Sequence, residues 1–214
     1  MSNIINLAAH RDPLPVLENR KVTRQPVARR PKNLDVRSRE YLEQHEVAAL
    51  IKAAKVGRYG QRDSTLIMVI ERHGLRVSEA IALRWDAVDF NAGTIAITRL
   101  KKGTPSTHYL KGPEMRALRD LRRDWPDSPF LFCSERGGPM TADNMRKLVS
   151  KAGRDAKLPF PVHPHMLRHA TGYALANRGT DTRTLQAYLG HRNISNTVRY
   201  TELAAGRFKN LWKD

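Results

Sequence analysis

The sequence predicts a mainly α-helical fold with a small antiparallel β-sheet, and two kinds of periodicity indicate it. Apolar side chains recur at helical spacing on both sides of residues 89–110, and within residues 89–110 the period falls to two. A chain of 214 residues can bury one good hydrophobic core and carry a short appendage. We therefore expect one folded domain at residues 37–214, preceded by an arm at residues 1–36.

The charge of the chain favours a polyanionic partner. Lysine and arginine number 38 against 21 aspartate and glutamate, which gives a formal net charge of +17 and an isoelectric point near 10.6. Such an excess favours nucleic acid over an acidic small molecule, with an anionic membrane surface as the weaker candidate.

The sequence also predicts a cytoplasmic protein. It contains no apolar run of about 18 residues and no signal-peptide hydrophobic region, so neither a membrane span nor secretion is expected. The single cysteine, Cys133, cannot form an internal disulfide and fits a reducing compartment. Its apolar neighbours indicate a small buried hydrophobic residue.

The arm at residues 1–36 lacks sustained periodicity and is rich in proline and basic residues. Its prolines are Pro13, Pro15, Pro26 and Pro31, and its clustered cations are Arg20, Lys21, Arg24, Arg29, Arg30 and Lys32. A segment of this composition buries too little apolar surface to fold alone, so we expect a flexible arm that becomes ordered on DNA. The alternative is a solvated tail without a role.

Two helices are expected to open the folded domain. From Ser38 onward, apolar residues mark an amphipathic helix: Tyr41, Leu42, Val47, Leu50 and Ile51. Residues 64–72 are strongly apolar and predict a buried helix that Gly74 closes.

Arg76 follows at the start of a third helix, where Leu83 and Trp85 are expected to pack inward. Free backbone N–H groups at a helix start favour an anion, so Arg76 is a candidate phosphate-binding residue. The alternative interpretation is a surface arginine that pairs with Glu79, three residues further along the helix.

Residues 89–110 predict a β-hairpin. Ile95 and Ile97 lie on one face of the first strand, residues 101–105 form a Lys-Lys-Gly-Thr-Pro turn, and residues 107–110 return as the second strand.

The segments after the hairpin are expected to be structural and to carry no catalytic residue. Pro113 opens a helix whose apolar positions are Met115, Leu118 and Leu121, residues 130–133 form a short strand or a buried extended segment, and Thr141 caps a helix carrying Met145, Leu148 and Val149.

The most informative stretch is residues 163–200. A helix over residues 165–178 would place Leu167, Ala170, Thr171 and Ala174 on one side, and His165, Arg168, His169 and Gly172 on the other. The first face is expected to pack, and the second to offer two imidazoles and a guanidinium.

Two further helices are expected to follow. Asp181 caps a helix that runs to Leu189 and stops at Gly190, which brings His191 just past its end. A last helix starts at Ser195 and carries Tyr200 near the end of its second turn.

The order of these residues resembles the tyrosine recombinase (phage integrase) family, whose members cut and rejoin DNA through a phosphotyrosine. The pattern is His165-x-x-Arg168, then Leu-Gly-His191, then Tyr200 nine residues later. Arg76 stands in the family's Gly-Leu-Arg-x-x-Glu setting, and wordings such as HPHMLRHA, YLGHRNI and TVRYT are similar to the short recombinases that invert fimbrial promoter DNA. The resemblance covers residues 37–214. Longer members of the family carry a helical core-binding domain ahead of the catalytic domain, and we expect no counterpart of it in residues 1–36.

The chemistry suits the residues of this pattern. Two arginines, Arg76 and Arg168, can each donate parallel hydrogen bonds to the phosphate oxygens on which charge builds during attack. Tyr200 is the candidate nucleophile, because a phenolate is a good leaving group and keeps the covalent intermediate reversible.

The resemblance implies the remaining roles. The hairpin delivers a lysine that protonates the departing 5′-oxygen; Lys101 takes this role, with Lys102 as a rival. His165 is the general acid or base near the tyrosine, and His191 donates a hydrogen bond to the scissile phosphate. The implied partner is double-stranded DNA, bound by a tetramer of the chain, with accessory DNA-bending proteins as possible further partners and the nucleoid as the location.

Two other interpretations compete with a recombinase. The histidines His163, His165, His169 and His191 suggest a zinc site, but no glutamate follows His165 as it follows the first histidine of HExxH, and the adjacent Arg168 repels a cation. We expect neither a metal nor a cofactor, and we expect His163 and His169 either to be structural or to support the site residues. Residues 181–200 also resemble a helix-turn-helix, so a non-catalytic DNA-binding regulator is the second alternative.

Overall fold

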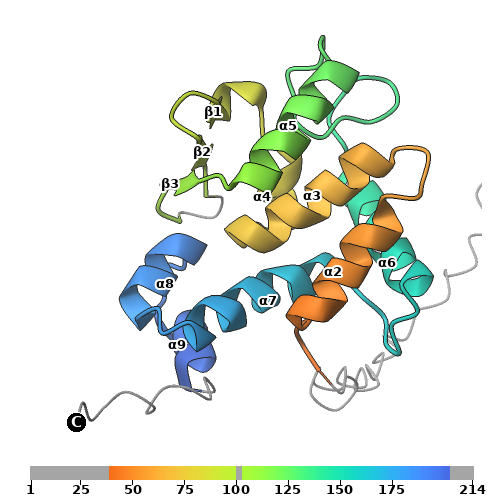
Figure 1. Cartoon of the computed structure of the whole chain (residues 1–214). Coiled ribbons are helices and arrows are strands. Elements are labelled where there is room, and N and C mark those ends of the chain that lie inside the picture. The colour runs from red at the N-terminus through yellow and green to blue at the C-terminus, as the bar shows by residue number, and fades with distance from the viewer. Residues whose placement is uncertain (1–38, 100–102, 203–214) are drawn as a thin grey trace, which may run out of the picture. The chain divides into compact units, whose positions relative to one another are not determined.

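The computed structural model describes residues 39–99 and 103–202, all of which belong to one compact unit, Ser38–Asp214 (Figure 1). In chain order the described elements are α2 (Gln44–Ala54), α3 (Gly60–His73), α4 (Val77–Ile81), the 3-10 helix η1 (Trp85–Ala87), β1 (Val88–Asp89), β2 (Thr94–Ile97), β3 (Ser106–Tyr109), α5 (Gly112–Asp124), α6 (Ala142–Asp155), α7 (Pro164–Asn177), α8 (Thr182–Leu189) and α9 (Ser195–Glu202). The predicted class, mainly helical with a small antiparallel sheet, is confirmed. The arm at residues 1–36, Lys101, Lys102 and residues 203–214 lie outside the described residues.

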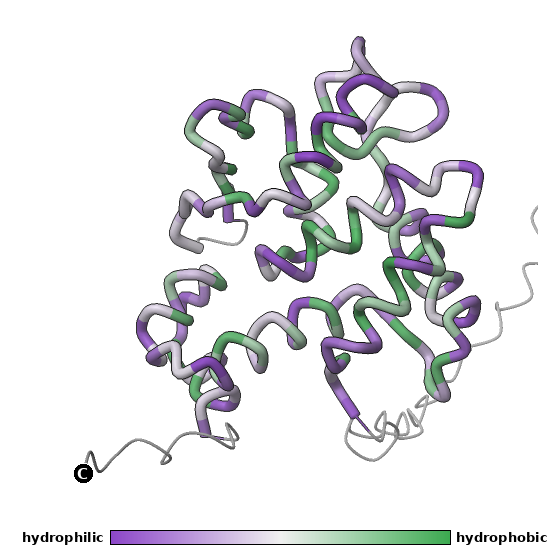
Figure 2. The backbone as a smooth tube through the Cα atoms, viewed as in Figure 1, coloured by the Kyte–Doolittle hydropathy of each residue, from purple (hydrophilic) through white to green (hydrophobic). Residues whose placement is uncertain are grey.

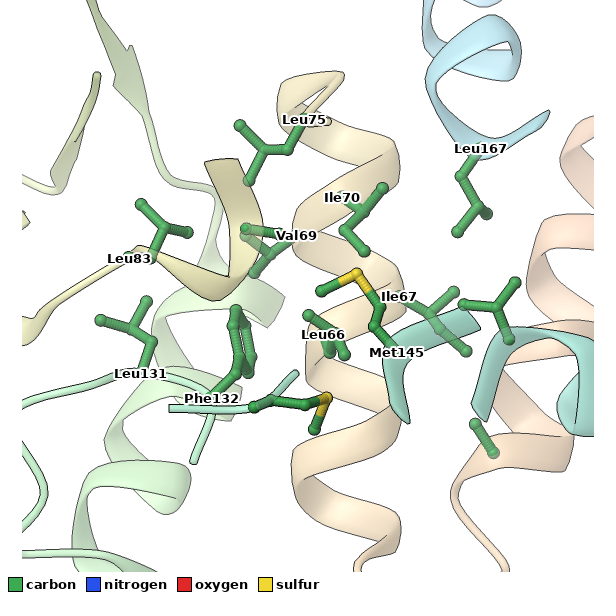
Figure 3. Close-up of a cluster of buried hydrophobic side chains, with 14 of the residues drawn as sticks. Leu66, Ile67, Val69, Ile70, Leu75, Leu83, Leu131, Phe132, Met145 and Leu167 are labelled. Atoms are coloured by element: carbon green, nitrogen blue, oxygen red, sulfur yellow. The ribbon is translucent and has the colours of Figure 1, made fainter. Parts of the chain in front are cut away.

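Helix α3 forms the centre of the hydrophobic core. It packs against α2, α5 and α7, and it runs through the middle of the view in Figure 1. Its residues Leu66, Ile67, Val69 and Ile70 are fully buried, and Figure 3 shows them facing side chains from the neighbouring segments. Figure 2 shows the matching stretches of hydrophobic residues along α2 and α3. The strongly apolar run of the sequence is thus the helix that organises the domain.

This central helix is longer than the sequence predicts. It begins at Gly60 rather than at residue 64, because its polar first turn is also buried: Arg62 donates a hydrogen bond of 2.9 Å to the carbonyl of Cys133. Cys133 is buried, as expected. Residues 130–133 form isolated bridges to Arg84 and Pro139, so they are the buried extended segment, not a strand of the sheet.

The sheet has the order β1-β2-β3 with both neighbouring pairs antiparallel. Ile95 pairs with His108 and Ile97 with Ser106, which confirms the predicted hairpin. The short strand β1 was not predicted, because two residues are too few to establish a periodicity. Ile95 and Ile97 face the core as expected, and both are buried.

Local caps set most helix ends. Gly74 and Gly190 end α3 and α8 in the left-handed conformation, with φ of 58° and 64°. Thr141 accepts a hydrogen bond from the Asn144 backbone, and Asp181 caps α8 by accepting from two backbone N–H groups. These four predictions are confirmed.

The first helix starts later than the sequence predicts. Its capping box, formed by Glu43 and Glu46, places the start at Gln44, so Tyr41 and Leu42 precede the helix. Leu42 is nevertheless buried in the core. No helix within residues 39–99 and 103–202 has both the length and the apolarity that crossing a membrane requires.

Candidate active site

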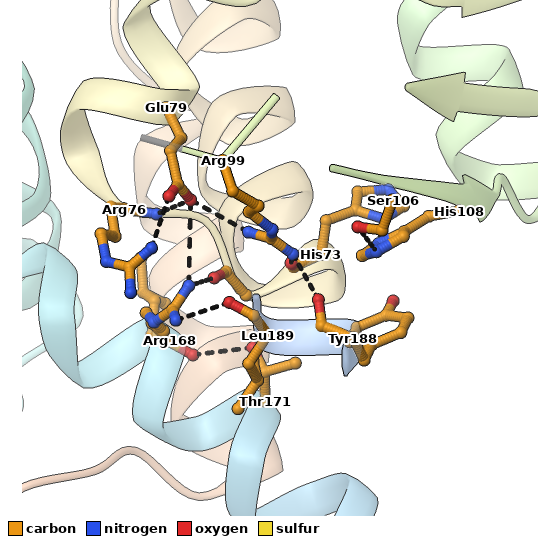
Figure 4. Close-up of polar contacts among 12 residues, drawn as sticks. His73, Arg76, Glu79, Arg99, Ser106, His108, Arg168, Thr171, Tyr188 and Leu189 are labelled. Carbon is orange, nitrogen blue, oxygen red and sulfur yellow. Dashed lines mark hydrogen bonds and ion pairs between the residues drawn. The ribbon is translucent and has the colours of Figure 1, made fainter. Parts of the chain in front are cut away.

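Three arginines meet at the carboxylate of Glu79, which is buried in α4 (Figure 4). Arg76 Nη1 lies 2.6 Å from Oε1, while Arg99 Nη1 and Arg168 Nη1 lie 2.9 Å and 3.8 Å from Oε2. Burial opposes ionisation of Glu79, but hydrogen bonds from Arg76 and the charge of Arg99 outweigh it and lower its pKa. One carboxylate facing three guanidinium groups leaves an excess of positive charge, which favours a phosphate.

Arg168 is held by the ends of two helices. It is 1% exposed, and its guanidinium donates to the carbonyl of Gly74 at the end of α3 and, at 2.7 Å, to that of Leu189 at the end of α8. Both carbonyls lie at the negative end of a helix dipole. Burial and the charge of Arg76 lower the pKa of Arg168, yet a guanidinium stays charged at neutral pH. The fold therefore fixes both the position and the charge of this residue.

Arg76, the other arginine of the predicted clamp, reaches the same carboxylate as Arg168. It is the N-cap of α4, and its side chain is 27% exposed and therefore partly open to solvent. Its ion pair with Glu79 is also present, so the alternative interpretation of Arg76 identified a real contact. The pair orients Arg76 within the arginine cluster.

His191 follows the glycine that ends α8. Its Nδ1 lies 2.8 Å from the hydroxyl of Thr197, and its ring stacks on that of Tyr200 at a centroid distance of 6.4 Å. Burial lowers the pKa of His191 to about 3, and the charges of Arg168 and Arg76 contribute. The imidazole is thus neutral at pH 7, with one N–H group to donate.

Tyr200 lies near the end of the second turn of α9 and is 2% exposed. Its hydroxyl oxygen is 2.7 Å from Nδ1 of His169, and its ring meets Tyr173 edge-on at 5.0 Å. The ring lies so close to Gly172 that a Cβ there would come within 2.7 Å of it. Burial raises the pKa of the Tyr200 phenol against the charge of Arg199. In this structure the predicted nucleophile is an interior group.

Helix α7 does not present the open polar face that its sequence predicts. Arg168, His169 and Gly172 are all buried, and only His165 of the predicted set is exposed. The reason is that α8 and α9 pack against α7 and cover this face. The His165 ring lies 4.4 Å from that of His169. Partial loss of hydration together with the charge of Arg168 lowers the pKa of His165 to about 4.

Three contributors to the site are not among the predicted catalytic residues: Arg99, Glu79 and His169. The sequence gives no signal for Arg99, because a lone arginine after a short strand is indistinguishable from a surface residue. Glu79 stands in the Gly-Leu-Arg-x-x-Glu setting and at pairing distance from Arg76, and this spacing is the available signal for it. His169 was expected to support the site, and the structure places it against the Tyr200 hydroxyl.

Residues 40–207 match the sequence model of the Phage integrase family. The chain belongs to this family. The recombinase is 42% identical over 183 residues to the type 1 fimbriae regulatory protein FimB of Escherichia coli K12, a match that covers 83% of this chain and 92% of FimB. The tyrosine recombinase XerD of Pseudomonas putida KT2440 is 34% identical over 179 residues, which cover 79% of this chain and 59% of XerD.

Solved structures agree with this assignment. The crystal structure of XerA recombinase superposes with a TM-score of 0.70 at 25% identity, over 79% of this chain and 62% of XerA. The predicted resemblance, including that to the fimbrial-switch type, is confirmed. The chain is a tyrosine-type site-specific recombinase that cleaves and rejoins DNA, and nothing in these comparisons supports a non-catalytic regulator.

Proposed function

We propose that Tyr200 and Arg168, both buried in this structure, are uncovered on DNA, and that Tyr200 then attacks a phosphodiester of double-stranded DNA held between Arg76 and Arg168. The phenol oxygen forms a bond to phosphorus, the bond from phosphorus to the 5′-oxygen breaks, and a 3′-phosphotyrosyl intermediate results. Attack by a DNA 5′-hydroxyl on the same phosphorus reverses the step and rejoins the strands. The cluster of three arginines around Glu79 is the observation that carries this proposal.

The other predicted residues complete the proton balance. Lys101, or its neighbour Lys102, gives a proton to the departing 5′-oxygen, and a histidine takes the phenol proton. His165 has this second role by resemblance, whereas His169 makes the contact with the Tyr200 hydroxyl. His191 donates its N–H group to a phosphate oxygen. None of these steps needs a metal or a nucleotide cofactor.

The biological outcome we propose is inversion of a DNA segment in the cytoplasm, at the nucleoid. The similarity to FimB supports this choice over integration or excision, which use the same chemistry on differently placed sites. A tetramer of the recombinase would hold the two sites together, with accessory DNA-bending proteins as additional partners. Short inverted repeats that flank a promoter beside the gene would support inversion.

Trapping of the covalent intermediate tests the proposal. In a duplex that carries the recombination site and a nick near the cleavage point, attack releases the short fragment that bears the 5′-hydroxyl. The reverse step is then lost, so the protein stays attached to DNA during boiling in detergent. Tyr200→Phe should bind the duplex normally and form no such complex. Tyr59→Phe, on a tyrosine outside the arginine cluster, is the matched control and should trap like the wild type. Trapping by Tyr200→Phe would contradict the assignment.

A further inference from the structure

We propose that Arg99 is a positioning residue, which ties the segment carrying Lys101 and Lys102 to the arginine clamp and to His191. This inference rests on the proposed function, because it concerns the placement of the lysine that acts as the acid. Arg99 is proposed to act through its neighbours: its Nη1 lies 2.9 Å from Glu79, and its Nη2 donates to two backbone carbonyls.

Arg99 and Arg168 bind neighbouring groups on the same two helix ends. Arg99 Nη2 donates to the carbonyl of His73 at 3.2 Å and to that of Tyr188, and Arg168 donates to the carbonyls of the residues that follow each of these. Figure 4 shows a dashed line from each of the two guanidinium groups to Glu79. The C-terminal ends of α3 and α8 are therefore joined twice, and Arg99 supplies one of the two links.

Arg99 and Gly103 stand on either side of the lysines and pack against each other. Arg99 is two residues before Lys101, and Gly103 is one residue after Lys102. A Cβ at Gly103 would lie 2.7 Å from the Cβ of Arg99 and 2.9 Å from the carbonyl oxygen of Gly190. The described residues before and after positions 100–102 are thus held at one place, beside the end of α8.

The same packing extends to His191. A Cβ at Gly190 would lie 2.6 Å from Cγ of Arg99, so the residue just before His191 rests on the arginine stem. Contacts this close leave no room for a side chain at either glycine without a shift. Arg99 is therefore a common support for Gly103 after the lysines, for Gly190 before His191 and, through Glu79, for Arg76 and Arg168.

A purely structural role predicts a different result from a positioning role. Arg62 is a suitable comparison, because it too is a buried arginine that binds a backbone carbonyl, that of Cys133 at 2.9 Å, and pairs with a carboxylate, that of Asp63. It lies outside the arginine cluster. Loss of Arg62 should lower the melting temperature without a specific effect on the chemical step.

The test compares two DNA substrates in single-turnover cleavage at saturating enzyme. In the second substrate, sulfur replaces the 5′-oxygen at the scissile bond, so the thiolate leaves without needing a proton. Arg99→Met should slow cleavage of normal DNA by about 100-fold or more, since a buried donor and its charge are lost. On the sulfur substrate at least about ten-fold of that loss should be recovered, because a misplaced lysine no longer limits the rate. Arg62→Met should cleave both substrates at wild-type rates.

Gly103→Ala keeps the proposal testable if Arg99→Met does not fold. Its added methyl group forces the segment away from an intact Arg99, so the same recovery on the sulfur substrate is expected. Equal losses on both substrates, or no loss, in these folded variants would overturn the proposal. Failure of the wild type to form a covalent complex would instead contradict the proposed function.

Discussion

The Nδ1 atom of His169 lies 2.7 Å from the hydroxyl oxygen of Tyr200 inside the domain. Burial lowers the pKa of His169 to about 3, and the charges of His165 and Arg199 contribute, so the ring is neutral at pH 7. A neutral imidazole with its proton on Nε2 accepts a hydrogen bond at Nδ1. In that tautomer the Tyr200 proton is directed at His169, one helical turn beyond the His165 of the family pattern.

This contact predicts that His169 receives the phenol proton. His169→Gln keeps a hydrogen-bond acceptor but cannot act as a base at neutral pH, so covalent complex formation should slow by about 10²-fold or more while DNA binding is unchanged. Single-turnover trapping and gel-shift assays measure the two effects. His165→Gln is the comparison. Full activity of His169→Gln together with a slow His165→Gln would return the role to His165.

Close packing against Gly172 predicts that Tyr200 cannot tolerate a neighbouring methyl group. Gly172→Ala should displace the tyrosine ring and cost about 1–3 kcal/mol in the free energy of unfolding, with a slower cleavage step. The control is Gly138→Ala, at a position where a Cβ meets nothing within 4 Å. Urea unfolding and the trapping assay check both effects, and a Gly172→Ala enzyme as stable and active as wild type would refute the packing argument.

The buried histidines predict a loss of stability in mild acid. Burial lowers the pKa of both His108 and His169 to about 3. Between the unfolded value of about 6.5 and these folded values, the unfolded chain binds more protons, so the free energy of unfolding falls as the pH falls. Each histidine contributes a slope of up to about 1.4 kcal/mol per pH unit.

Urea unfolding at several pH values from 7.5 to 5 measures this slope. His108→Gln should make it shallower, whereas His45→Gln, at a histidine whose side chain is 75% exposed, should leave it unchanged. A free energy of unfolding independent of pH across this range would contradict the prediction.

Alanine substitutions can decide whether Lys101 or Lys102 gives the proton to the departing 5′-oxygen. Alanine at the true proton donor should slow cleavage of normal DNA by about 10²–10⁴-fold and should be rescued by sulfur at the leaving position. Alanine at the other lysine should show no difference between the two substrates. Rescue of neither variant would remove both lysines from this role.

If the basic arm at residues 1–36 binds phosphates, removing its positive charges should change the salt dependence of DNA binding. Replacing the six cationic residues between positions 20 and 32 by glutamine removes their phosphate contacts, and each lost contact should flatten the plot of log affinity against log salt by about 0.9. The single-turnover rate of saturated enzyme should stay nearly constant, since the proposed catalytic residues all lie beyond residue 75. An unchanged slope would identify the arm as a solvated tail.

The helix ends and the family pattern could be predicted from the sequence, because both depend on residues that are close together along the chain. The caps at Gly74, Thr141, Asp181 and Gly190 were predictable because each satisfies backbone groups within one helical turn. The pattern from His165 to Tyr200 identified the family and its candidate residues before any fold was known.

Only the tertiary structure decided which groups meet. Arg99 binds the carbonyl of Tyr188, 89 residues away, and His169 contacts Tyr200, 31 residues away. Periodicity places a side chain on a face of its own helix, but it does not say what covers that face. Helix α7 is the clearest case. Its sequence predicts an exposed polar face, whereas α8 and α9 cover that face and bury Arg168 and His169. The ion pairs and hydrogen bonds of these two side chains offset the cost of removing polar groups from water.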